Sequence, residues 1–222
     1  MKPQSTIGCA TTPDGKELVL YERDGAYSIR VNGLELMSSR AHGSEEALAR
    51  LALSRVKHPK PTVLVGGLGM GFTLRAVLDQ VAPKSRVVVA EIFPAVVGWY
   101  RAELSHLAGD PLDDSRVVVE ECDVVDLIAA NPESYDAVLL DVDNGPAAFT
   151  IARNEGLYGM EGLSTVRRAL RPRGILGVWS ADPDPPFAKR LKNAGFRVTI
   201  ETIPARGRTK GPKHTIFIGE MK

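Results

Sequence analysis

Short apolar runs alternate with amphipathic stretches through most of the chain, and this alternation predicts a mainly parallel α/β sheet. From residue 62 onward the apolar runs are rich in Val and Leu, as is typical of strands buried on both faces. We expect strands at 62–66, 86–91, 116–121, 136–141 and 174–180, and helices at 71–81, 94–107, 123–130, 157–170 and 184–194. Residues 197–203 and 214–219 are predicted to pair as two strands, which gives the sheet an antiparallel edge.

The first 61 residues follow a different pattern. Residues 16–37 alternate imperfectly and contain the tight-turn signal Asn32-Gly33, so we expect a small antiparallel β unit within residues 1–40. A helix is expected to begin at Ser44 and to occupy a connector over residues 41–61, which ends in two prolines. Residues 62–222 then form the main domain.

Composition and charge exclude several classes of protein. The chain has 222 residues, with 28 Lys and Arg against 27 Asp and Glu, so its balanced charge gives no reason to expect a nucleic acid or an anionic membrane as partner. No apolar run approaches the ~20 residues of a membrane span. The first residues lack an apolar signal core, so we expect a cytoplasmic protein, with Cys9 and Cys122 as thiols. The four histidines show no metal-ligand spacing, and we expect no metal.

The segment 63–71, Val-Leu-Val-Gly-Gly-Leu-Gly-Met-Gly, is the strongest functional signal. An apolar strand enters a glycine loop and then a helix, which is typical of a site where a nucleoside approaches the backbone closely. A second strand ends at Glu91, twenty residues after Gly71, where an acid suits a ribose with two free hydroxyls.

Two further acids follow predicted strands. Asp123 is placed to cap the next helix and also to accept a hydrogen bond from an adenine amino group. Asp141 follows a buried strand, where a carboxylate is costly without a partner or a chemical task. Asp143 and Asn144 come directly after it, and paired acids beside a nucleotide pocket can hold an amine and take its proton.

At these residues the chain resembles the spermidine synthase family, a branch of the class I S-adenosylmethionine-dependent transferases. The resemblance covers most of residues 62–180 and implies a Rossmann-like class I methyltransferase fold for the main domain. It implies that Glu91 binds ribose, that Asp123 binds adenine, and that Asp141 accepts a proton from an amine nucleophile, with Asp143 beside it. The full set of implied donor-binding residues is Gly67, Leu68, Gly69, Met70, Gly71, Glu91, Ile92, Cys122, Asp123, Val124 and Asp141. The implied acceptor-binding residues are His42, Glu46, Asp143 and Asn144.

The chain departs from the family pattern at several places. Spermidine synthases carry an Asp where this chain has Met70, and that Asp holds the amino group of decarboxylated S-adenosylmethionine. An apolar residue there does not repel the carboxylate of ordinary S-adenosylmethionine. Gly71-Phe72-Thr73-Leu74 is similar to the loop of plant putrescine N-methyltransferases. Ser44 stands where the family has a polyamine-contacting tyrosine, and residues 147–156 form an insertion where its active-site lid follows the catalytic Asp.

The sequence therefore favours an S-adenosylmethionine-dependent methyltransferase acting on an amine or another small nucleophile. The alternative is an aminopropyltransferase that uses decarboxylated S-adenosylmethionine, as spermidine and polyamine synthases do. A third option is a ligand-binding homologue without catalysis, and a weaker fourth is a nicotinamide dehydrogenase. The resemblance also implies a homodimer. The basic stretch 206–213 is expected to be a solvated hairpin tip or, alternatively, a contact for an acidic substrate.

Overall fold

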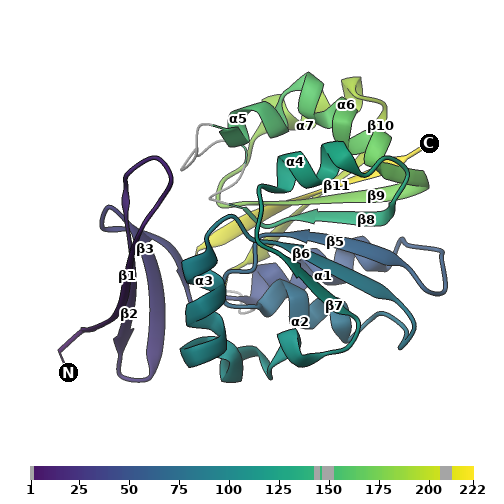
Figure 1. The fold of residues 1–222 in the computed structure, drawn as a ribbon. Coiled ribbons are helices and arrows are strands. Elements are labelled where there is room, and N and C mark those ends of the chain that lie inside the picture. The colour runs from purple at the N-terminus through teal and green to yellow at the C-terminus, as the bar shows by residue number, and fades with distance from the viewer. Residues whose placement is uncertain (1–2, 143–145, 147–152, 206–211) are drawn as a thin grey trace.

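The computed structural model describes residues 3–142, 146, 153–205 and 212–222, and it contains two β-sheets (Figure 1). The larger sheet has seven strands in the order β10-β11-β9-β8-β5-β6-β7. Five of them run parallel, and β11 pairs antiparallel with both of its neighbours. The strands are β5 (Thr62–Gly66), β6 (Arg86–Ala90), β7 (Val117–Glu120), β8 (Tyr135–Leu140), β9 (Leu170–Ser180), β10 (Phe196–Pro204) and β11 (Lys213–Met221). The parallel sheet with an antiparallel edge is thus confirmed.

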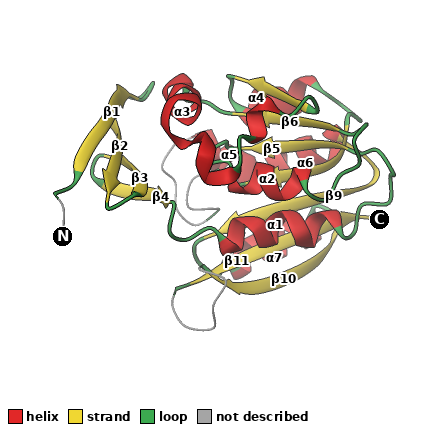
Figure 2. Cartoon of the chain, turned by 90° about the horizontal axis from the view of Figure 1, so that it is seen from below, coloured by secondary structure: helices red, strands yellow, loops and turns green. Residues whose placement is uncertain are grey.

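Helices cover both faces of this sheet, as Figure 2 shows. The alternation of strand residues explains why: Val63 and Val65 pack in one buried cluster, whereas Leu64 packs in the other. One face carries α1 (Gly43–Leu53), α2 (Phe72–Leu78) and α3 (Pro94–Trp99), and the opposite face carries α4 (Val124–Ala130), α5 (Arg153–Tyr158), α6 (Met160–Ala169) and α7 (Pro185–Asn193). The central strands β5, β6 and β8 are therefore buried on both faces, as their continuous apolar runs predict, whereas the edge strands β7 and β10 are partly exposed.

The N-terminal unit is a four-stranded antiparallel sheet that stands beside the larger body (Figures 1 and 2). Its strands are β1 (Ser5–Thr11), β2 (Glu17–Arg23), β3 (Ala26–Val31) and β4 (Leu34–Ser38). The strands within residues 16–37 were predicted, but β1 was not. Gly8 on β1 faces the ring of Trp99 so closely that a side chain there would overlap it, which shows how tightly β1 packs against α3. Leu18 and Ile29 enter the same core cluster as the larger sheet.

The predicted helix over 157–170 is wrong in two respects. It is broken at Gly159 into α5 and α6, and Leu170 already belongs to β9. Pro172 and Gly174 do not delay the strand, because the pairing register with β8 shifts between Tyr135 and Ala137 and Arg173 adopts a positive φ of 65°. A bulge of this kind accommodates residues that a regular strand would exclude. The predicted helix 94–107 also differs, since α3 passes into a π-helical turn (Tyr100–Leu104) and a 3-10 turn (Ser105–Ala108).

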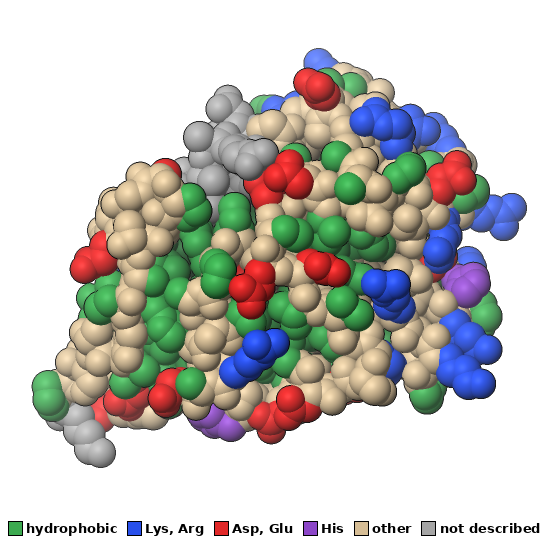
Figure 3. All heavy atoms as spheres, in the orientation of Figure 1, with side chains coloured by type: hydrophobic (Ala, Val, Ile, Leu, Met, Phe, Trp, Pro, Cys, Tyr) green, Lys and Arg blue, Asp and Glu red, His purple; other side chains and the backbone are tan. Residues whose placement is uncertain are grey.

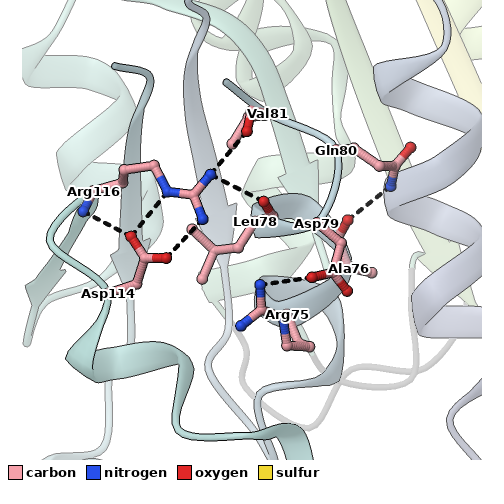
Figure 4. A network of polar contacts seen from close by, with 8 residues as sticks. All are labelled: Arg75, Ala76, Leu78, Asp79, Gln80, Val81, Asp114 and Arg116. Carbon is pink, nitrogen blue, oxygen red and sulfur yellow. Dashed lines mark hydrogen bonds and ion pairs between the residues drawn. The ribbon is translucent and has the colours of Figure 1, made fainter. Parts of the chain in front are cut away.

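Arg116 fastens the end of α2 to the loop before β7 (Figure 4). Its guanidinium donates to the carbonyl oxygens of Leu78 and Val81 at 3.0 and 2.8 Å, and to both carboxylate oxygens of Asp114. This pairing lowers the pKa of Asp114 to about 2. The network holds the far end of the helix whose beginning follows the glycine loop.

No helix in the described part of the chain is both long and apolar enough to cross a bilayer. On the face seen in Figure 3, acidic side chains lie over the middle, whereas Lys and Arg gather toward the end away from the N-terminal sheet. The basic stretch 206–211 lies outside the described residues.

Candidate active site

Two adjoining pockets lie at the carboxyl ends of β5, β6 and β8, where ligands bind in open α/β sheets. We call the first the glycine-loop pocket; it is lined by Leu18, Ile29, Leu36, Met37, Gly67, Gly69, Ala90, Glu91, Ile92, Phe93, Val96, Cys122, Asp123, Val124, Asp141 and Val142. We call the second the carboxyl pocket; it is lined by Leu36, Met37, Ser38, Glu45, Leu68, Gly69, Met70, Phe72, Thr73, Asp141 and Trp179. Leu36, Met37, Gly69 and Asp141 line both, so the two pockets adjoin along these residues.

The glycine loop has a conformation that requires glycine. Gly67, Gly69 and Gly71 all have positive φ, at 89°, 52° and 80°. A side chain at Gly67 would overlap the carbonyl oxygen of Asp141, and one at Gly71 would overlap the ring of Tyr100. These glycines are required by the close approach of the chain to itself, and the approach of a nucleoside to the loop stays a prediction.

Glu91 stabilises the glycine loop by accepting hydrogen bonds from the backbone on either side of the site. Its side chain is buried, and its two carboxylate oxygens accept hydrogen bonds from the backbone N–H groups of Leu68 at 3.0 Å and Phe93 at 2.9 Å. Burial raises the pKa of Glu91, and the backbone hydrogen bonds oppose that rise. Glu91 lines the glycine-loop pocket, and each carboxylate oxygen has a further lone pair with which a sugar hydroxyl could bond.

Cys122, Asp123 and Val124 line the same pocket opposite the glycine loop. Asp123 caps α4, accepting a hydrogen bond of 2.9 Å from the Val125 N–H. The capping role foreseen from the sequence is confirmed, and the side chain also faces the pocket. Burial and the nearby acids Glu120 and Asp123 raise the pKa of the Cys122 thiol, so it is not activated as a nucleophile.

Asp141 and Glu45 both face the carboxyl pocket. The Thr73 hydroxyl donates a hydrogen bond of 2.6 Å to Asp141 Oδ2 and lies 3.5 Å from the Glu45 carbonyl oxygen. Burial raises the pKa of Asp141 to about 6, although the Thr73 hydrogen bond lowers it. Burial and the charge of Asp141 raise the pKa of Glu45 to about 8. Two carboxyl groups that oppose each other's ionisation in one pocket are suited to bind a cation and to move a proton.

Glu45 is hydrogen-bonded to Ser44 of α1, which in turn contacts residues of β9 and β11. Ser44, fully buried, donates its hydroxyl to Glu45 Oε2 at 2.7 Å and lies 2.8 Å from His214 Nδ1. The indole N–H of Trp179 donates to the same hydroxyl oxygen at 3.0 Å. Ser44 thus connects the carboxyl pocket with His214, which is only partly buried.

His42 and Glu46, predicted to contact the acceptor, lie in a different place. They pair with each other at 2.7 Å and line a separate surface hollow with Arg50 and Arg75. The His42 ring stacks on Phe72 with centroids 4.1 Å apart, and Phe72 separates this hollow from the carboxyl pocket. Asp143 and Asn144 fall outside the described residues.

The sequence reading missed Glu45, Thr73 and the Ser44–His214 contact. A signal for Glu45 was present, because it precedes Leu48, Ala49 and Ala52 by three, four and seven residues and so shares their buried face of α1. Met70 is 3% exposed, packs in the core and lines the carboxyl pocket. Within the described ranges, no group of three or more His, Cys, Asp or Glu side chains could hold a metal ion.

The order of the strands, with an antiparallel strand inserted next to the last position, defines a class I methyltransferase-like α/β fold. A family model described as the spermine/spermidine synthase domain matches residues 41–184. The chain belongs to this family.

Two curated relatives and a solved structure agree with the family. The chain is 28% identical over 131 residues to a polyamine aminopropyltransferase of Korarchaeum cryptofilum and 30% identical over 133 residues to one of Saccharolobus solfataricus. The matched parts are 59% and 60% of this chain, but they are only 38% and 42% of those relatives' lengths. The spermidine synthase of Thermotoga maritima superposes with a TM-score of 0.79 over 98% of this chain and 73% of that one, at 18% identity, and so supports the fold.

Proposed function

We propose that this protein transfers an aminopropyl group from decarboxylated S-adenosylmethionine to an amine acceptor. The observation that carries the proposal is the pair of carboxyl groups, Glu45 and Asp141, that lines one pocket directly beside the glycine loop. The curated relatives are named polyamine aminopropyltransferases, which favours the same reaction, the alternative on sequence grounds, over the methyl transfer expected first.

In this proposal the glycine-loop pocket holds the adenosyl part of the donor. Gly67 and Gly69 line this pocket, and in the proposal Glu91 faces the ribose and Asp123 faces the base. The sulfonium then lies near Asp141, where the two pockets join. Much of the acceleration in such a displacement comes from holding the two reactants in line.

Asp141 takes the proton that the acceptor nitrogen loses when it forms the new C–N bond and the sulfur leaves with its electron pair. A pKa of about 6 leaves Asp141 mainly ionised at neutral pH and close to the working pH of a general base. Glu45 supplies the acid that the glycine loop lacks at Met70, because both residues line the carboxyl pocket. An ammonium group on the donor or acceptor would lower the pKa of Glu45 and pair with its carboxylate.

Methyl transfer from S-adenosylmethionine is the second candidate, and Met70 favours it. Its buried, apolar side chain lines the pocket where the tail of the donor would lie and offers no charge to repel a carboxylate. The two candidates share the adenosyl site and the base, and they differ in the tail of the donor.

The test is to incubate the protein with each donor and a panel of diamines and monoamines, and to identify the sulfur product by mass spectrometry. Methylthioadenosine is expected from the decarboxylated donor, whereas S-adenosylhomocysteine from the ordinary donor would support methyl transfer. Asp141→Asn should lower turnover at least a hundredfold with donor affinity retained, and Glu46→Gln, exposed and outside the pocket, is the matched control. Neither sulfur product with any amine would refute the proposal.

A further inference from the structure

The hydrogen-bonded residues behind Glu45 reach from the carboxyl pocket toward solvent. Glu45 Oε2, Ser44 Oγ and His214 Nδ1 are joined by contacts of 2.7 and 2.8 Å. His214 lies at the start of β11 and is partly exposed, whereas Ser44, which lies between Glu45 and His214, is fully buried. A buried hydroxyl that bridges an acid and an imidazole offers a path for a proton where water is excluded.

Trp179 restricts what the Ser44 hydroxyl can do. The indole N–H is a donor only, so it always occupies one lone pair of Ser44 Oγ. The single hydroxyl hydrogen then points to Glu45 or to His214, and the other partner must donate to the remaining lone pair. Only two arrangements satisfy all three groups, and they differ by the position of one proton.

In the first arrangement Glu45 is protonated and donates to Ser44, whose O–H donates to the neutral Nδ1 of His214. In the second, Glu45 is a carboxylate that accepts from Ser44, and the ring donates from Nδ1 to Ser44. To pass from the first to the second, the Glu45 O–H bond breaks, the hydroxyl exchanges its hydrogen, and an Nδ1–H bond forms. The net result is one proton moved from Glu45 to the imidazole, which as imidazolium can release a proton to solvent.

We propose that Glu45, Ser44 and His214 form a proton relay that carries the proton of the acceptor amine from Asp141 to solvent. The inference rests on the proposed function, which makes Asp141 the first proton acceptor. Asp141 passes the proton to Glu45 across the pocket that both line, and Glu45 returns to the carboxylate through Ser44. Asp141 is thereby ready for the next turnover without opening the pocket.

The charges around the relay favour the first step, from Asp141 to Glu45, and make the step from Glu45 to His214 the uphill one. On the pocket side, the described acids that act on Glu45 are Asp141 and Glu46, and both favour its protonated form. At the other end, burial lowers the pKa of His214 and the charge of Asp182 opposes this. Lys213 precedes His214 on the exposed end of β11. Because the pKa of His214 is lowered, the ring is mainly uncharged, so it can accept a proton from Glu45 and then release it readily to solvent.

The first arm of the test needs no substrate. The titration of the His214 ring is followed by NMR in the wild type, in Glu45→Gln, in Ser44→Ala and in the double variant. Glu45→Gln should shift the pKa of His214, because the two groups compete for the single Ser44 hydroxyl hydrogen, and this effect should largely disappear once Ser44 is Ala. A His214 titration indifferent to Glu45 would overturn the relay, whether or not the protein transfers anything.

The second arm measures turnover. His214→Asn keeps a hydrogen-bond acceptor for Ser44 but cannot carry the proton, so turnover in dilute buffer should fall about tenfold and recover with added imidazole, at unchanged KM for the donor. His58→Ala, at an exposed histidine far from the pockets, should show no buffer dependence. If His214→Asn turns over like the wild type in dilute buffer, the relay is refuted. If the wild type transfers to no amine while the NMR coupling is present, the proposed function fails and the proton path stands.

Discussion

The Thr73 hydroxyl donates a 2.6 Å hydrogen bond to Asp141 Oδ2, and so joins the first turn of α2 to the acid at the end of β8. This bond favours the ionised form of Asp141 against the effect of burial. The same helix that follows the glycine loop therefore sets the protonation of the proposed base. The proposed donor site and the proposed base thus share one structural element.

Removing this hydrogen bond should move the pH dependence of turnover. Thr73→Val takes away the donor, so the pKa of Asp141 should rise above about 6 and the acidic limb of the rate profile should move to higher pH by roughly one unit. Thr73→Ser retains the hydroxyl and should keep the wild-type limb. If the acidic limb of the Thr73→Val profile stays in place, the ionisation of Asp141 does not control the rate.

Glu45 should make the protein less stable as the pH rises. Its pKa is raised to about 8 in the folded chain against 4.5 for an unperturbed glutamate, so the folded state holds the proton more tightly. The free energy of unfolding should therefore be highest below pH 4.5 and should fall between pH 4.5 and 8. Because Glu45 is partly exposed, Glu45→Gln should stabilise the protein above this range by only roughly 1–2 kcal/mol.

Denaturant unfolding at several pH values checks this expectation. At the acidic end of the range Glu45→Gln and the wild type should have nearly the same stability. Glu103→Gln, at an exposed acid that lines neither pocket, is the control and should follow the wild type. Equal stability of wild type and Glu45→Gln at alkaline pH would contradict the raised pKa.

Gly67 should tolerate no side chain. Gly67→Ala places a Cβ against the carbonyl oxygen of Asp141 at a φ of 89°, so we expect a loss of roughly 2–4 kcal/mol of stability and weaker donor binding. Gly33→Ala is the matched control, since Gly33 has a φ of 79° with nothing near its missing Cβ, and it should lose only about 1 kcal/mol. Thermal unfolding and calorimetry separate the two, and equal losses would mean that the contact with Asp141 is not limiting.

Met70 should decide the preference between donors. Met70→Asp puts an acid into the carboxyl pocket and should shift binding from S-adenosylmethionine toward its decarboxylated form by at least tenfold, as measured by calorimetry. Burial of the new charge will also cost stability, so Met70→Leu serves as the folded apolar control with the wild-type preference. An unchanged ratio in folded Met70→Asp would place the donor tail elsewhere.

The main sheet could be predicted from the sequence, because its central strands are buried on both faces and their apolar runs are unambiguous. The Asp123 cap and the conformation of the glycine loop were equally readable, since each depends on neighbouring residues alone. The start of β9 was missed because Pro172 and Gly174 are usually breakers, and only pairing with β8 and a bulge at Arg173 make them part of a strand. Local propensity gave way there to tertiary pairing.

The candidate site was only partly readable, for a similar reason. Glu46 was preferred over Glu45 by position in a motif, yet the packing of α1 turns Glu45 toward Asp141 and leaves Glu46 outside. The link between Ser44 and His214 joins α1 to the last strand, and no local pattern encodes such a contact. Glycine loops and caps are properties of short segments, whereas pairs of titrating groups are properties of the whole fold.

The wall of the glycine-loop pocket contains Leu18 and Ile29 from the N-terminal sheet, and Leu36 and Met37 from its last strand. Any molecule that fills this pocket therefore touches both sheets at once, and its binding free energy adds to the adhesion between them. Without a ligand in this pocket, amide hydrogen exchange should be faster than in the bound protein, and the increase should be larger in β2 and β3 than in β5 or β8. Hydrogen exchange in the N-terminal sheet would thus report whether the glycine-loop pocket is occupied.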